Sequence, residues 1–178
     1  MNVNNPEAVS VSKWPIIWKF SFIIAGCTFA YTLVLYLTGL YASFGMGLLS
    51  LVITIVLLVV CLRKYRSLNN NSMTFGTAAV IGILISIIAS AIHSALNAVY
   101  LAFIDDSTLI AMTETTMRAL EDSGMNGDQI EMIMGLYKNF LFTPVGIFVT
   151  GIISGVIGGV IISLILAAIL KKDPPLAA

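Results

Sequence analysis

Four long apolar runs constrain this chain more than any other feature of its sequence. They cover about residues 16–40, 44–62, 75–104 and 144–170, and Lys19 is the only fixed charge within them. At about 1.5 Å per residue, a helix of roughly 20 residues crosses the ~30 Å hydrocarbon layer of a bilayer. The sequence therefore predicts an all-α membrane protein with four transmembrane helices, the third long enough to tilt or protrude.

The composition supports a single membrane domain. Hydrophobic residues make up 58% of the chain and charged residues 10%, whereas soluble domains carry roughly 25% charged residues. Little of the sequence is left to form a soluble core. We therefore expect one domain at 16–170, between tails at 1–15 and 171–178.

The basic residues are distributed unevenly along the chain. Only two lie in the segment 105–142, and the other seven lie at or near the remaining ends of the apolar runs. Because Lys and Arg are enriched on the cytoplasmic side of membrane proteins, we expect both termini in the cytoplasm and residues 105–142 outside. Three basic residues after the second run also suggest contact with anionic lipid: Arg63, Lys64 and Arg66.

The third and fourth runs carry a small residue at every fourth position. Such stripes let membrane helices approach closely, because lipid supplies no hydrophobic drive for their association. We expect these residues to pack the third helix against the fourth, while a homodimer seam remains the alternative. The stripes are Ala78, Gly82, Ser86, Ser90 and Ser94, and Gly151, Gly155, Gly159, Ser163 and Ala167.

The outer segment predicts two amphipathic helices over the mouth of the bundle. Their expected ranges are 107–122 and 128–140, with a turn at Gly124, Asn126 and Gly127. Five of the eight methionines lie here, at 112, 117, 125, 132 and 134. Methionine is an adaptable packing residue, and no His or Cys accompanies these, so they favour packing or a partner surface over a copper site. We predict no metal and no cofactor.

One polar cluster is expected inside the bilayer, where an ionisable side chain is a functional candidate by default. It consists of His93 and Asn97, one helical turn apart, with Ser90 nearby. We favour an interhelical hydrogen bond over a role in a transport path, because His93 has no acidic neighbour in the run. The expected partners are Asn97 itself or a hydroxyl of Tyr31, Thr32, Ser50, Thr54 or Thr150.

The two cysteines are expected to be small core residues. Cys27 should lie near the middle of the first helix and Cys61 near the far end of the second, too far apart in depth for a disulfide. The residues before Cys27 resemble a lipoprotein cleavage site, but the apolar run continues well beyond it. We therefore expect the first helix to be retained.

The whole layout resembles a family of bacterial four-span membrane proteins catalogued as domain of unknown function 4199. The residues that carry the resemblance are Arg63, Tyr65 and Arg66, the Asn-rich loop before Phe75 and Gly76, the acidic insert, and the ending Leu164, Ile165, Ala167, Ala168, Lys171 and Lys172. The resemblance implies a bacterial inner-membrane location. It implies no activity, cofactor or site residue.

Two function classes follow from these observations. The first is a noncatalytic scaffold or accessory subunit that contacts the lipid bilayer and a membrane-protein partner or further copies of itself. The alternative is a small oligomeric transporter or channel component with His93 and Asn97 along its path. An enzyme is disfavoured because no nucleophile, base and orienting group can be assembled from the sequence. Nothing in the sequence indicates a nucleic-acid partner.

Overall fold

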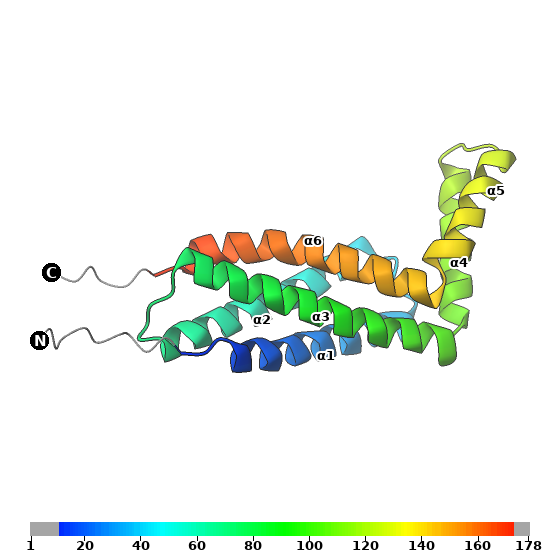
Figure 1. Cartoon of the computed structure of the whole chain (residues 1–178). Helices are drawn as coiled ribbons and strands as arrows, with labels where there is room; N and C mark the ends of the chain where they lie inside the picture. Colours follow the sequence, from blue (N-terminus) through cyan, green and yellow to red (C-terminus); the bar gives the residue numbers. More distant parts are fainter. Residues whose placement is uncertain (1–10, 173–178) are drawn as a thin grey trace, which may run out of the picture.

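Four helices long and apolar enough to cross a membrane form a bundle in the computed structural model, which describes residues 11–172 (Figure 1). They are α1 (Trp14–Thr38), α2 (Phe44–Leu68), α3 (Phe75–Phe103) and α6 (Pro144–Leu170). Two shorter helices, α4 (Ser107–Asp122) and α5 (Gly127–Leu136), form a hairpin between α3 and α6. The prediction of an all-α fold with four spans and a hairpin between the third and fourth is confirmed.

The two ends of the bundle differ. At one end, which we call the terminal end, the described chain begins and finishes, and the backbone N–H of Val11 donates to Asn69 while Met73 pairs with Lys172. The α4–α5 hairpin occupies the other end, which we call the hairpin end (Figure 1). α4 runs across the direction of the bundle and extends beyond it.

Local chemistry sets several helix boundaries. α1 ends at Gly39, whose φ of 70° is the left-handed conformation that glycine adopts without strain. α6 begins after Thr143, whose hydroxyl accepts a hydrogen bond from the backbone N–H of Gly146, and Pro144 occupies the first turn. The turn before α5 is a capping box in which Asn126 and Gln129 each accept from the backbone of the other.

α2 is longer than the sequence predicted. It continues past Leu62 to Leu68, so Arg63, Lys64 and Arg66 lie on its last turns rather than in a loop. Lys and Arg are good helix formers, and their long side chains can reach water from a helix that is leaving the apolar layer. The first charge therefore marked the end of the apolar run but not the end of the helical backbone.

The predicted single helix at 128–140 is also wrong in detail. α5 ends at Leu136 and passes into a π-helical turn, η1 (Tyr137–Leu141). The chain then enters α6, where the carbonyl oxygen of Phe140 lies so close to Gly146 that any Cβ there would overlap it. This junction requires glycine at position 146.

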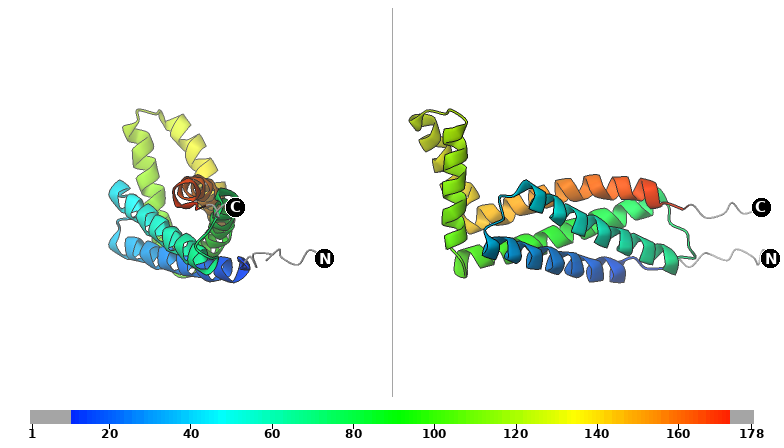
Figure 2. Two further views of the ribbon diagram at one scale, coloured as in Figure 1. Left: turned by 90° about the vertical axis from the view of Figure 1, so that its left-hand side faces the viewer. Right: turned by 180° about the vertical axis from the view of Figure 1, so that it is seen from behind.

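The apolar core is concentrated toward the terminal end. Among the residues described, the buried residues of α2 all lie in its second half: Leu58, Cys61, Leu62 and Tyr65. They pack with residues such as Ile17, Ile81, Ile85 and Ala167. In the end-on view of Figure 2, α2 swings away from α6 toward the hairpin end. The bundle is therefore tightly packed at the terminal end and parted between α2 and α6 farther along.

Among the described helices, α3 and α6 pack most closely, and their small residues face one another in a fixed antiparallel register. A Cβ added to Gly82 would lie 2.7 Å from the Oγ of Ser163, and one added to Gly155 would lie 2.5 Å from the Cβ of Ser90. Ser86 faces Gly159 and Ser94 faces Gly151 even more closely. Each step of four residues along α3 thus meets a step of four along α6, and every one of these pairs sets a serine against a glycine.

The same register continues beyond the helices. Met73 and Lys172, which precede α3 and follow α6, form an antiparallel bridge with N···O distances of 2.7 and 2.8 Å. Between this bridge and Gly82, the next matching positions are Ala78 and Ala167, both fully buried. The pairing of α3 with α6 is therefore fixed from the terminal end to Ser94.

Candidate functional site

His93 and Asn97 do not hydrogen-bond to one another; each joins α3 to α1. The Nε2 of His93 lies 3.2 Å from the Oγ1 of Thr32, and the phenolic hydroxyl of Tyr36 donates to the Oδ1 of Asn97 over 2.8 Å. Thr32 is among the hydroxyl partners predicted for His93, and Tyr36 was not predicted for Asn97. Both pairs connect residues one turn apart on each helix, so they form two successive ties between α1 and α3.

Aromatic rings surround these ties. Phe29 meets His93 edge to face with a centroid distance of 6.3 Å, and it meets Tyr100 at 6.4 Å. Tyr36 stacks on Tyr100 with centroids 5.8 Å apart. His93 is thus held on one side by Thr32 and Phe29, which fixes the orientation of the imidazole ring.

A cavity of about 530 Å³ lies beside His93 and has walls from all four spans. Besides His93, six hydroxyl-bearing residues line it: Thr28, Ser50, Thr54, Ser86, Ser90 and Ser154. Five glycines also line it: Gly47, Gly151, Gly155, Gly158 and Gly159. The volume is in the range of small-molecule sites.

The mouth of the cavity lies between α2 and α6. Its exposed lining residues are Gly47 and Leu51 on α2 and Ser154 on α6, whereas Ser86 and Gly159 at its floor are buried. This is the side on which α2 diverges from α6. In a bilayer the opening would face lipid, because both helices are apolar spans.

The cavity lining carries no Asp, Glu, Lys or Arg. Within residues 11–172, the acidic side chains all lie between Asp105 and Glu131, outside the four spans. A buried charge without a partner is costly, so the cavity is suited to an uncharged guest. The sequence predicted His93 and Ser90 as a candidate site, but the cavity could not be predicted because it arises from the divergence of α2.

The predicted packing residues face one another across α3 and α6, as described above. Ser90 belongs to both arrangements, because its Cβ lies against Gly155 while the residue lines the cavity. Its hydroxyl donates to the carbonyl of Ile87 at 3.1 Å. The hydroxyl of Ser163 is buried and has no hydrogen-bond partner among the described residues. At Ser163, α3 and α6 therefore pack closely without a side-chain hydrogen bond between them.

The basic residues near the end of α2 have different surroundings. Arg63 and Lys64 are exposed, whereas Arg66 is half-buried and its Nη1 donates to the carbonyl oxygen of Leu170 at 3.2 Å. A cation at the C-terminus of a helix satisfies a free carbonyl and interacts favourably with the helix dipole. Arg66 therefore caps α6, and Arg63 and Lys64 are the residues free to meet lipid headgroups.

The cysteines differ from the prediction in one respect. Both are free thiols; Cys61 is fully buried, but Cys27 is exposed on the outer surface of α1. The expectation that Cys27 is a core residue is therefore wrong. The first run is apolar on all sides, so its sequence gave no signal of which face turns inward.

Asp105 is a structural residue that the sequence reasoning missed. Its carboxylate accepts hydrogen bonds from the hydroxyls of Ser107 and Thr108 and from the backbone N–H of Thr108, at the start of α4. The hydrogen bonds from Ser107 and Thr108 hold the pKa of this carboxyl below its usual value. The Asp-x-Ser-Thr pattern before a helix was the available signal.

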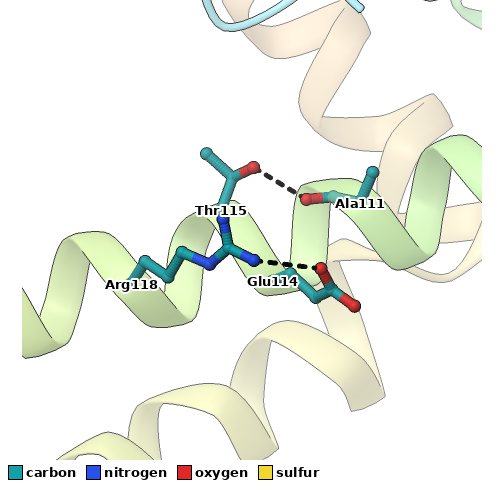
Figure 3. A network of polar contacts seen from close by, with 4 residues as sticks. All are labelled: Ala111, Glu114, Thr115 and Arg118. Atoms are coloured by element: carbon teal, nitrogen blue, oxygen red, sulfur yellow. Dashed lines mark hydrogen bonds and ion pairs between the residues drawn. The ribbon is translucent and has the colours of Figure 1, made fainter.

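The hairpin contains both packed and exposed apolar residues. Met134 is buried, whereas Met132 is 72% exposed, and Phe140 on the adjoining η1 is 67% exposed. On α4, Arg118 and Glu114 form an exposed ion pair at 3.5 Å, and the hydroxyl of Thr115 donates to the carbonyl of Ala111 (Figure 3). These polar contacts lie within a single helix, so they support α4 locally and do not hold the hairpin against the bundle.

The chain was also compared with known proteins. A family model described as "Protein of unknown function (DUF4199)" matches residues 19–172, which include most of α1 and every later element. Comparison with curated proteins and with solved structures gave no match.

Proposed function

We propose that this chain, which belongs to the DUF4199 family, is a noncatalytic membrane protein that serves as a scaffold or accessory subunit. The observation that carries the proposal is the α4–α5 hairpin, which projects beyond the bundle (Figure 1) with large apolar side chains uncovered. Ile110, Met132 and Leu136 on the hairpin and Phe140 on the adjoining η1 are each more than half exposed. Unlike the exposed apolar residues of the spans, these belong to no candidate span, and we infer that they lie outside the apolar layer, where such a surface favours a protein partner.

The chemistry of the spans agrees with a noncatalytic role. His93 is engaged with Thr32, and no carboxylate or second imidazole accompanies it in the cavity lining. Proton relays and hydrolytic sites need paired titratable or nucleophilic groups. The polar ties between α1 and α3 are what interhelical hydrogen bonds provide in other membrane bundles.

We place the protein in the bacterial inner membrane with both termini in the cytoplasm. Within residues 11–172, the terminal end carries Lys13, Lys19, Arg63, Lys64, Arg66, Lys171 and Lys172, and the hairpin segment carries only Arg118 and Lys138. This bias supports the orientation through the positive-inside rule. The exposed apolar surface formed by Ile110, Met132, Leu136 and Phe140, which we call the partner surface, would then lie on the outer side of the membrane.

The partner surface is tested by site-specific photo-crosslinking in native membranes. A photoreactive amino acid at Met132 should give one discrete cross-linked protein, and the cross-link should weaken when Leu136 and Phe140 are replaced by serine. The matched control is the same amino acid at Ile161, which is 55% exposed on α6 and should give lipid adducts. Lipid adducts alone from both positions would contradict a protein partner.

A transporter or channel component is the second candidate, and the cavity beside His93 favours it. Its test is solute flux in reconstituted vesicles, comparing the natural protein with His93→Gln between about pH 5.5 and 8, the range of a histidine titration. A path that uses the imidazole would lose its pH-dependent flux in the variant while the fold and oligomer size stay unchanged. A flux with that behaviour would displace the scaffold assignment.

A further inference from the structure

Four of the six hydroxyl groups that line the cavity donate their protons to carbonyls of their own helices, and those of Ser50 and Ser154 donate to no group among the described residues. Thr28 donates to the carbonyl of Ile24 at 2.7 Å and Thr54 to that of Ser50 at 3.1 Å. Ser86 donates to the carbonyl of Gly82 at 2.9 Å, and Ser90 donates to its own helix in the same way. A hydroxyl that has donated its proton keeps its lone pairs. The cavity wall therefore offers a guest mainly hydrogen-bond acceptors.

His93 supplies a hydrogen-bond donor that complements these acceptor oxygens. Among the described residues, the hydroxyl of Thr32 makes no hydrogen bond other than the one to Nε2. In an apolar layer a hydroxyl proton needs an acceptor, so we assign Thr32 as the donor to Nε2. The uncharged imidazole then carries its own proton on Nδ1, which has no partner within residues 11–172. Nδ1 thus adds an N–H donor to the acceptor oxygens of the cavity wall.

The remaining features limit the class of guest. Glycines together with Ile24, Leu51, Ala89 and Ile162 give the cavity an apolar interior, and its mouth faces the lipid side between α2 and α6. Because no charged side chain lines it, a carboxylate or an ammonium group would enter without a counter-ion. A hydroxyl group both donates and accepts, which matches the wall and the imidazole together.

We propose that this cavity binds an uncharged, membrane-dissolved amphiphile through a hydroxyl group, as in a long-chain alcohol or an alkylphenol. The hydroxyl donates to the oxygens of Thr28, Thr54 or Ser90 and accepts from Nδ1 of His93, while the apolar body extends through the mouth into lipid. Binding of this kind does not depend on the partner surface of the hairpin or on movement of the guest across the membrane.

Gly158 makes a sharp test possible. It lines the cavity, yet a Cβ placed on it meets no atom within 4 Å, so Gly158→Leu should fill the cavity without disturbing α3. Gly26→Leu is the matched control, because Gly26 is equally free of neighbours but does not line the cavity. Circular dichroism and size-exclusion chromatography verify that both variants fold as the natural protein does.

The probe is a diazirine-bearing dodecanol, photolysed with the full-length protein in lipid nanodiscs, and the labelled residues are located by mass spectrometry. Labelling should concentrate on cavity residues, fall at least about ten-fold in Gly158→Leu, and persist in Gly26→Leu. Dodecanol and 4-octylphenol should compete, and their relative strength separates an aliphatic alcohol from a phenol as the preferred source of the hydroxyl. Dodecane, dodecanoate and dodecylamine should compete weakly.

A second pair of variants tests the hydrogen bond that Nδ1 of His93 donates to the hydroxyl group of the guest. His93→Leu should weaken competition by dodecanol about 3- to 10-fold, the value of one hydrogen bond. Thr32→Val breaks the same tie to α1 but keeps the imidazole, so it should retain most of the binding. Equal losses in the two variants would assign His93 a structural role only and overturn its part in binding.

Two outcomes overturn the proposal as a whole. The first is labelling that is equally strong with a diazirine-bearing dodecane, since the hydroxyl would then contribute nothing. The second is absence of labelling in a dimeric natural protein that Gly158→Leu converts to a monomer, since the cavity would then hold a helix of a second copy.

Discussion

The close approach of α3 and α6 at Gly155 allows a quantitative prediction. An added Cβ would stand 2.5 Å from the Cβ of Ser90, whereas carbon atoms in contact prefer about 3.5–4.0 Å. The helices would have to separate locally by about 1 Å or more. Overpacking of this kind costs about 1–3 kcal/mol, and Gly155→Leu should cost more than Gly155→Ala because a larger group must be accommodated.

Gly158→Ala supplies the reference for this change. Both substitutions gain the same helix propensity, about 1 kcal/mol for alanine over glycine, but a Cβ at Gly158 meets no atom within 4 Å. The difference in unfolding free energy between the two alanine variants therefore isolates the packing cost, and we expect Gly155→Ala to be less stable by about 1–3 kcal/mol.

The assay is reversible unfolding in mixed micelles, followed by circular dichroism as the denaturing detergent increases. The double variant Ser90→Gly with Gly155→Ala should recover much of the loss, because the two positions are in direct contact. Equal stabilities of Gly155→Ala and Gly158→Ala would refute the packing argument. A double variant no better than the sum of its single changes would refute the assigned pairing of Ser90 with Gly155.

Three further predictions concern other parts of the molecule. Cysteines introduced at Ser72 and Asn126 should react with impermeant thiol reagents from opposite sides of the membrane, with Ser72 reached from the cytoplasm; labelling of both from one side would contradict the topology. His93→Gln should retain the fold, while His93→Leu should lower the unfolding free energy by about 1 kcal/mol in the detergent titration. A larger loss of stability in His93→Gln than in His93→Leu would exclude a stabilising hydrogen bond between α1 and α3 at this position. The folded-state pKa of Asp105 is lowered, so its contribution to ordering α4 is present above the unfolded value, near 3.8, and is lost as pH falls through the lower folded value. NMR spectra of the first turn of α4 should show this acid transition in the natural protein and not in Asp105→Asn.

The sequence was sufficient to predict the parts of the fold that depend on apolar length and on residue spacing. The runs near Phe75–Phe103 and Pro144–Leu170 appear as α3 and α6 because nothing interrupts them before a cap or a charge. The hairpin helix at Ser107–Asp122 was also predictable from its amphipathic pattern. In each case the signal is local, so one sequence is enough to read it.

The features that the sequence did not predict depend on how the helices are arranged in space. α1, α2 and α6 have almost no amphipathic pattern, so the sequence did not show that Cys27 faces outward or that α2 diverges from α6. The partner of Asn97, Tyr36, lies on another helix at a distance in sequence that no spacing rule connects. The cavity follows from the path of α2, which is set by packing at Leu58 and Leu62.

The tight pairing of α3 with α6 has a consequence for how the chain is made. The two helices are separated in sequence by α4, α5 and η1, so α3 is synthesised before its partner. Until α6 arrives, the serine face at Ser86 and Ser94, buried in the finished bundle, is exposed to lipid or to a membrane chaperone. A ribosome that stalls within the hairpin would thus leave a three-span intermediate in which this stripe of small residues on α3 has no helix packed against it.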